Sequence, residues 1–417
     1  MVDYRPIPDE RDVFHEYRSY AFRPEEGLAA YDPDEHETPR DTLGSRRGVY
    51  ATEGADDANP RSVCRHYWLE SRVRGDTHRT AGLASVATPP EYRRRGYVRE
   101  LLAHSLAEYR DHGVRVSVLW PFRYRFYRRY GWDTANRIVT HECDPAVLSF
   151  ATDALEAPAG GGAPDSDPGP FHRLEADEYA VLKEAYGAHL ERYSLALERD
   201  AEWWRHRVFG GSDRDPFVYA YVRDGQVKGY LVYTIDGGDE RTMAVSELVA
   251  VDHEGRLAML SFCHRHGSQV ERVRLRVPDA TPIREIARDP DEIDTTVSEG
   301  PMVRIVDVAE TLSALSYPDR DATVRLAVED PLADWNEGTF TLEASNGTAA
   351  CTRLGEASAD GDADVSLDVA ALSQLAVGAR SATDLERTGR LEVRDSTVVE
   401  TLATLFPESD VYLGEFF

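Results

Sequence analysis

Three arginines and a glycine, Arg93-Arg94-Arg95-Gly96, stand between a predicted strand over residues 80–88 and a predicted helix that begins at Tyr97. A helix N-terminus leaves backbone N–H groups unpaired and carries a partial positive charge, so it binds phosphate groups. Glycine lets a ligand approach the backbone closely, and arginine side chains add charge-assisted hydrogen bonds. The turn therefore predicts a site for a phosphorylated cofactor, although a solvated basic helix face would have the same composition.

The elements around this turn are predicted from their hydrophobic patterns. The strand over residues 80–88 stops at Pro89-Pro90. From Tyr97 the apolar side chains recur at helical spacing until Gly113, which favours a helix end. Residues 114–120 alternate like a second strand. Strand, basic turn, helix and strand make a βαβ unit, whose loop faces the helix N-terminus.

A similar order of elements recurs in the middle of the chain. Residues 217–222 and 227–235 flank Asp224-Gly225 like a hairpin, and a strand, a helix and a strand follow up to residue 277. The equivalent turn is now Asp252-His253-Glu254-Gly255-Arg256. Its carboxylates would repel a phosphate, so the repeat indicates a duplicated fold whose second copy has lost anion binding.

Composition shifts divide the chain into three domains. Residues 156–170 are rich in glycine, proline and aspartate and are typical of a flexible linker. A second boundary is expected near Pro301. We therefore expect domains over residues 1–155, 171–300 and 301–417, of which the third mixes strands with later helices and is α+β.

The charge balance excludes several function classes. Acids outnumber bases 75 to 48, for a net charge of −27, and the only lysines are Lys183 and Lys228. Such a surface repels nucleic acid and anionic lipid, and it is tolerated where salt screens it. We expect a halophilic, cytoplasmic protein with no nucleic-acid partner, no signal peptide and no membrane span.

The cysteines indicate neither a disulfide framework nor a metal site. All four are far apart, without a CxxC pair. The tightest metal-like cluster, Cys263-His264-Arg265-His266, would scatter its side chains around a helix. We therefore expect no metal.

Two segments resemble a known family. Residues 86–96 resemble the acetyl-CoA loop of the GNAT superfamily of N-acetyltransferases, in which a glutamine or arginine is followed by two residues, glycine, one residue, and glycine or alanine; here the last position is Val98. Residues 121–132, Pro-Phe-Arg-Tyr-Arg-Phe-Tyr-Arg-Arg-Tyr-Gly-Trp, are similar to a segment of the enhanced intracellular survival (Eis)-like branch. That branch has the domain order expected above, so the resemblance covers essentially the whole chain.

The resemblance implies a fold and an activity. The fold is α/β and α+β: an active GNAT domain that binds acetyl-CoA, a degenerate GNAT-like domain, both with mixed sheets, and a sterol-carrier-protein-like α+β domain. The activity is transfer of acetyl from acetyl-CoA to a primary amine of a small molecule or peptide, without a metal. The resemblance also implies a homo-oligomer, with a hexamer as the expected state.

The resemblance further implies roles for individual residues. Tyr127 matches the family's general acid. A phenol with a pKa of about 10 is a suitable proton source for a thiolate with a pKa of about 8.5. The alternative is that Tyr127 is only a packed aromatic side chain beside Phe126. The carboxylate of the last residue, Phe417, matches the base, and a final packed strand is the alternative. The residues implied to bind the cofactor are Ala87, Thr88, Pro89, Arg94, Arg95, Gly96, Tyr97 and Val98.

A second function, from a different class, remains open at this point. The third domain could bind a lipid or another apolar ligand and use the acetyltransferase fold as a scaffold. The arginine-glycine turn and Tyr127 favour the enzyme.

Overall fold

The computed structural model describes residues 2–7, 13–26, 31–32, 38–52, 59–156, 171–211, 214–238, 240–355 and 363–417. The expected linker falls almost wholly outside these residues. The chain forms two compact units, residues 1–136 with 300–417 and residues 137–299. We call them the first and second unit.

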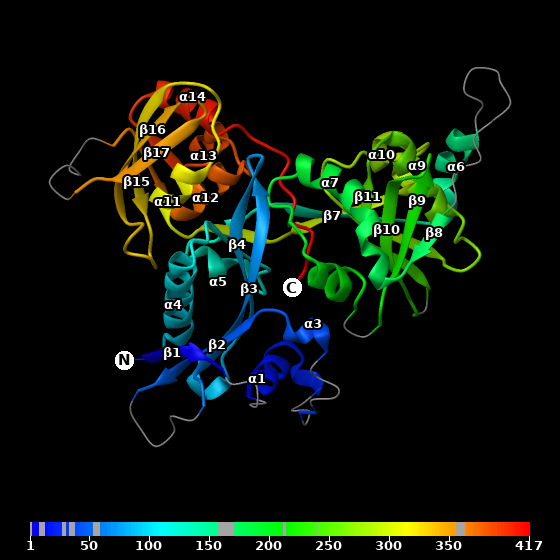
Figure 1. Ribbon diagram of the computed structural model, residues 1–417, viewed down its shortest axis with the longest axis horizontal. Helices are drawn as coiled ribbons and strands as arrows, with labels where there is room; N and C mark the ends of the chain where they lie inside the picture. Colours follow the sequence, from blue (N-terminus) through cyan, green and yellow to red (C-terminus); the bar gives the residue numbers. More distant parts are fainter. Residues whose placement is uncertain are drawn as a thin grey trace. The chain divides into compact units, whose positions relative to one another are not determined.

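The first sheet of the first unit carries the predicted βαβ element. Its strands, in spatial order, are β1 (Val2–Pro6), β2 (Ser45–Ala51), β3 (Ser62–Val73), β4 (Asp76–Ala87), β5 (Val116–Leu119), β14 (Met302–Ile305) and β6 (Asp133–Thr134). The helices of this part are α1 (Val13–Phe22), α3 (Pro39–Thr42), α4 (Tyr97–Asp111) and α5 (Tyr124–Arg128). Helix α4 packs beside β3 and β4 (Figure 1) and buries Leu101, Leu102 and Leu106 in the core. The predicted helix start at Tyr97 is observed.

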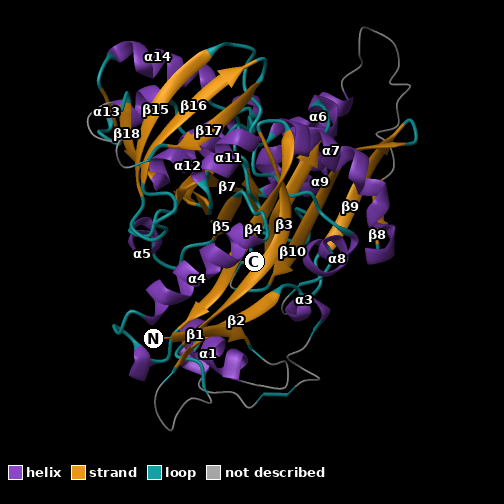
Figure 2. Cartoon of the chain, turned by 60° about the vertical axis from the view of Figure 1, so that its left-hand side comes forward, coloured by secondary structure: helices purple, strands orange, loops and turns teal. Residues whose placement is uncertain are grey.

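The rest of the first unit is a separate five-stranded sheet covered by helices. The strands, in spatial order, are β17 (Thr348–Arg353), β16 (Gly338–Ser345), β15 (Ala322–Glu329), β18 (Val365–Asp368) and β19 (Leu391–Val393). The helices are α11 (Val308–Ala314), α12 (Val369–Val377), α13 (Ala382–Arg387) and α14 (Ser396–Leu405). Figure 2 shows α11 and α12 alongside these strands. A run of four strands, β15 to β18, precedes most of the helices here, and this segregation of strands and helices is that of an α+β domain.

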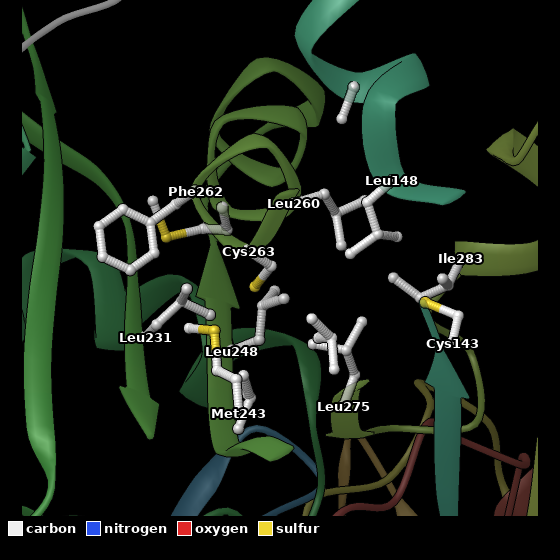
Figure 3. Close-up of a cluster of buried hydrophobic side chains, with 14 of the residues drawn as sticks. Cys143, Leu148, Leu231, Met243, Leu248, Leu260, Phe262, Cys263, Leu275 and Ile283 are labelled. Atoms are coloured by element: carbon white, nitrogen blue, oxygen red, sulfur yellow. The ribbon is translucent and has the colours of Figure 1, made fainter. Parts of the chain in front are cut away.

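The second unit repeats the mixed sheet. Its strands, in spatial order, are β13 (Asp294–Glu299), β7 (Arg137–Cys143), β12 (Arg272–Val277), β11 (Thr242–Ala250), β10 (Gln226–Asp236), β9 (Phe217–Arg223) and β8 (Phe171–Leu174). The helices are α6 (Ser149–Glu156), α7 (Lys183–Arg192), α8 (Ala201–Trp203), α9 (His253–His264) and α10 (Ile283–Ile286). Side chains of α9, such as Leu260 and Cys263, gather with Leu248 and Leu275 of the strands in one buried cluster (Figure 3).

Strand pairing departs from the domain boundaries expected from composition. Strand β7, expected in the first domain, lies in the second sheet between β12 and β13. Strand β14, expected to open the third domain, pairs with β5 and β6 of the first sheet. Composition marks where the chain lacks apolar residues, whereas sheet membership depends on pairing between residues far apart in sequence. For this reason the linker and the unit boundary do not coincide.

Candidate active site

The basic turn opens the N-terminus of α4 to ligands. Gly96 is the N-cap residue at φ +86°, and no side chain caps the first turn of the helix. A Cβ at Gly96 would meet no atom within 4 Å, so the space above the turn is open. Arg94 also has a positive φ, 60°. Left-handed residues next to helical backbone turn successive N–H groups toward one side, which suits an anion.

A cavity of about 760 Å³ lies at this turn. It includes six of the eight predicted cofactor residues, Ala87, Thr88, Arg94, Gly96, Tyr97 and Val98, whereas Pro89 and Arg95 do not line it. The cavity is also lined by residues outside that set, which are Arg93 of the predicted basic turn and Ala21, Phe22, Val86, Tyr92, Arg99, Phe122, Arg123, Phe126, Arg129 and Tyr130. The aromatic-basic segment 121–132 contains five of these. Ala21 and Phe22 come from α1, and no local signal connects them to the turn.

Strand β4 changes its pairing where it reaches the cavity. Its register with β5 runs from Thr80 opposite Val116 to Leu83 opposite Leu119. On the other side, Val63 pairs with Ala87 and Arg65 with Ala84, so β4 carries one extra residue, a bulge. Ser85 in this bulge has φ 52°. The end of β4 therefore extends past β5 and borders the cavity with its backbone.

Two polar contacts fix the end of β4. The Ser62 hydroxyl donates to the Ala87 carbonyl at 3.2 Å, and Arg93 Nε donates to the Thr88 carbonyl at 2.9 Å. These bonds hold Ala87 and Thr88, two of the residues that were expected to bind the cofactor.

Tyr127 is buried next to the cavity, although it does not line it. The side chain is 3% exposed, and its ring makes edge contacts with Phe122, Phe126 and Trp132. Burial, and secondarily the nearby Cys64 thiol, raises the pKa of Tyr127 well above its usual value. The phenol is therefore protonated at neutral pH and can act as a proton donor.

The end of the chain docks on β3 and β4 of the same unit. Trp120 Nε1 donates to the Glu415 carbonyl at 2.6 Å, and the Trp120 ring contacts that of Phe416 at 5.3 Å between centroids. The Phe417 ring contacts Tyr67 at 5.3 Å. Figures 1 and 2 both mark the C-terminus beside these strands.

Gly82 makes room for the terminal ring. A Cβ at this position would lie 2.8 Å from Phe417 Cε2 and 2.9 Å from Cζ. Gly82 is a residue of β4 opposite Val118 of β5, and the sequence analysis gave it no role. The docked C-terminus thus lies near the end of β5, after which the chain continues to Tyr127.

The corresponding helix of the second unit is closed. The Asp252 carboxylate caps α9 by accepting from Gly255 N at 2.7 Å. Arg223 pairs with both Asp252 and Glu254 at 2.6 Å, and a Cβ at Gly255 would overlap the Lys228 carbonyl. The side chains of the second copy occupy the place that is open at α4.

Within the residues that the structure describes, no group of three or more His, Cys, Asp or Glu side chains is arranged to hold a metal. No helix among the same residues is long and apolar enough to cross a membrane.

Comparison with family models finds three domains along the chain. Residues 4–135 match an acetyltransferase (GNAT) domain, residues 195–305 match a second acetyltransferase (GNAT) domain, and residues 308–414 match a sterol carrier protein domain. The duplicated fold predicted from the sequence is confirmed.

Comparison with curated proteins and solved structures extends the match to most of the chain. An uncharacterized N-acetyltransferase of Streptomyces griseus is 28% identical over 351 residues, which cover 80% of each chain. N-acetyltransferase Eis of Mycobacterium tuberculosis is 28% identical over 338 residues, 80% of this chain and 79% of that one.

Solved structures share the fold over the whole chain. A GCN5-related N-acetyltransferase from Anabaena variabilis aligns with a TM-score of 0.82 at 19% identity, and Eis1 from Mycobacterium abscessus with 0.74 at 21% identity; each alignment covers 100% of both chains. The chain thus contains two acetyltransferase (GNAT) domains followed by a sterol carrier protein domain, and over most of its length it is similar to N-acetyltransferases, among them Eis.

Proposed function

We propose that the first domain binds acetyl-CoA in the cavity at the N-terminus of α4 and transfers its acetyl group directly to a primary amine. The observation that carries this proposal is the contrast between the two copies. The α4 turn is uncapped, rich in arginine and open to a 760 Å³ cavity, while the α9 turn is filled by its own carboxylate.

The cavity suits a phosphorylated cofactor with an extended arm. The N–H groups at the start of α4 and the side chains of Arg93 and Arg94 would hold pyrophosphate. The backbone at the end of β4 would pair with the arm, and exposed Phe22 and Phe122 offer apolar surface at the rim. When bound, acetyl-CoA supplies an activated acetyl thioester.

Tyr127 is the proposed general acid. In direct transfer the amine nitrogen forms a bond to the acetyl carbon, the carbon–sulfur bond breaks, and the departing sulfur takes a proton. The Tyr127 hydroxyl is protonated at neutral pH, as an ordinary phenol is, and burial raises its pKa further. Its neighbours Phe126 and Tyr130 line the cavity.

The terminal carboxylate of Phe417 is the proposed base. A chain end usually frays, yet here a Trp120 hydrogen bond and two ring contacts hold the last three residues. The carboxylate, with an ordinary pKa of about 3.5, is ionised at neutral pH. It would take the proton that the acceptor ammonium loses before the neutral amine attacks the acetyl carbon.

A thiol-release assay tests this function. Purified protein is mixed with acetyl-CoA and a panel of primary amines in multimolar salt, and calorimetry compares acetyl-CoA with fatty acyl ligands. We expect acetyl-CoA binding and amine-dependent thiol release. Binding of fatty acyl ligands without acetyl-CoA binding would instead support the lipid-binding alternative.

A further inference from the structure

Arg304 is a fully buried cation that joins the first sheet to the sterol carrier protein domain, residues 308–414, which we call the third domain from here on. It is a residue of β14, which lies between β5 and β6, and its side chain is 0% exposed. A buried arginine is stable only with partners that compensate the loss of water. Its partners therefore define its role.

One side of Arg304 is paired with the third domain. Nη2 donates to both carboxylate oxygens of Asp330, at 2.8 and 2.6 Å, and the Asp330 carboxylate is also 0% exposed. The same carboxylate accepts from the Leu332 and Ala333 backbone N–H groups and from Asn336 Nδ2, at 2.9, 3.1 and 3.0 Å. Asp330 is thus fixed by its own domain and in turn fixes the guanidinium.

The other side of Arg304 contacts the turn that follows Tyr127. Nη1 donates to the Tyr130 carbonyl, and the guanidinium carbon lies 5.1 Å from the Trp132 ring centroid. Gly131 between them has φ +92°, and a Cβ there would overlap Arg304 Nη1. The turn and the guanidinium fit each other closely enough to require glycine.

This turn is bonded directly to the residue that carries the phenol. The Tyr130 and Trp132 backbone N–H groups both donate to the Tyr127 carbonyl, at 2.9 and 3.4 Å. The ring of Trp132, held against Arg304, also makes an edge contact with the Tyr127 ring. A shift of Arg304 would therefore move Tyr127 through both backbone and ring.

The third domain contacts this helix at a second point. Arg128, the residue after Tyr127, pairs with Asp368 at 2.9 Å. Arg128 also reaches Asp133 at 2.9 Å, and Asp133 pairs with Arg390 of the third domain at the same distance. This partly exposed network holds residues 128 and 133, on either side of the turn that the buried Arg304–Asp330 pair contacts.

We propose that Arg304 and Asp330 are positioning residues, through which the sterol carrier protein domain holds the Tyr127 segment in its reactive place. The proposal rests on the proposed function of Tyr127 as general acid. It gives the third domain a part in acetyl transfer that requires no lipid.

A double-mutant cycle on kcat tests the proposal. Asp330→Asn keeps the shape and one acceptor oxygen but removes the charge opposite Arg304. We expect it to lower kcat about tenfold in the otherwise unchanged enzyme and less than about twofold in a Tyr127→Phe background, because coupled residues are not additive. An equal fold-loss in both backgrounds, or no loss in either, would overturn the proposal.

Two further variants separate the possible failures. Arg304→Lys retains the buried charge without the planar fork, and it carries the same cycle if D330N does not fold, as judged by thermal unfolding. Glu310→Gln is the matched control, since Glu310 joins the same two domains through Arg115 at 3.0 Å without touching the turn; its kcat should be unchanged. If Tyr127→Phe alone leaves kcat unchanged, the proposed function fails instead.

Discussion

At the scale of single residues, the candidate site combines a phenol whose pKa is changed by burial with two glycines whose missing side chains leave space. Tyr127 is a phenol whose pKa rises because its charged form would lose water. Gly82 and Gly96 matter for the side chains they lack: one leaves room for the Phe417 ring, and the other leaves space above the α4 amides. A substitution at each of these three residues tests its role.

Tyr127→Phe should lower kcat by about 10²-fold or more, the usual contribution of a general acid. Acetyl-CoA affinity should be nearly unchanged, because the hydroxyl does not line the cavity. Since the pKa of Tyr127 is raised, the wild-type enzyme should lose no activity from this group up to about pH 10. Calorimetry and a pH profile of kcat check both points, and equal losses of affinity and kcat would mean a structural role.

Gly82→Ala should displace the terminal ring, because the new methyl group would lie 2.8 Å from Phe417. Displacing a catalytic group by about 1 Å can cost about 10²-fold in rate, so kcat should fall by ten- to a hundredfold. Gly187→Ala is the matched control, since its added Cβ meets no atom within 4 Å. Activity unaffected by Gly82→Ala would contradict the base assignment.

At the scale of elements, function follows from how a helix begins. Helices α4 and α9 both follow a strand of a mixed sheet and both start at a glycine-containing turn. Helix α9 satisfies its first amides with the Asp252 side chain, whereas α4 begins without a side-chain cap. An uncapped helix start is available to a ligand. The change from an arginine-rich turn to an acidic turn therefore accounts for the open start of α4 and the capped start of α9.

Gly96→Ala should raise the KM for acetyl-CoA about tenfold. A left-handed alanine costs roughly 1 to 2 kcal/mol, and the methyl group enters the space above the amides. Gly225→Ala has the same strain and the same open surroundings in the second unit, at φ +74°. It should lower thermal stability without changing KM. Steady-state kinetics of the two variants compare their KM values for acetyl-CoA, and equal values would contradict the role of Gly96.

At the scale of the whole molecule, the chain is interleaved rather than divided into successive domains. Strand β14 follows the second unit in sequence but completes the first sheet, and all four of its residues are buried. The first sheet therefore requires residues from beyond the second unit. The same strand carries Arg304, so completing the sheet also brings the third domain to the Tyr127 segment.

The isolated segment 1–155 should therefore fail to fold. Without β14 it loses the burial of Met302, Val303 and Ile305, at about 1.5 to 3 kcal/mol for each side chain, and it exposes the edges of β5 and β6. A fragment of residues 1–136 joined by a short linker to 300–417 keeps every strand of the first unit. Circular dichroism and thermal melting should show cooperative unfolding only for the joined fragment.

Local order was largely predictable from the sequence. Helix α4 from Tyr97 and the hairpin around Asp224-Gly225 formed as predicted, because each is set by periodicity and end signals within a short window. The basic turn also predicted where six of the expected cofactor residues would gather. Phe22 and Gly82 were missed, because their roles come from partners remote in the chain.

By itself, the sequence determined the duplicated fold, the difference between an arginine turn and an acidic turn, and the resemblance to the Eis-like N-acetyltransferases. Only the tertiary structure decided which strands share a sheet, where the C-terminus docks, and that Arg304 connects Asp330 to the Tyr127 segment. The physical reason is that turns and helices form between near neighbours, whereas sheet order and buried ion pairs depend on residues far apart in the chain. At positions such as Arg304, an arginine in a short apolar strand gives no sign of its partner until the fold brings the two together.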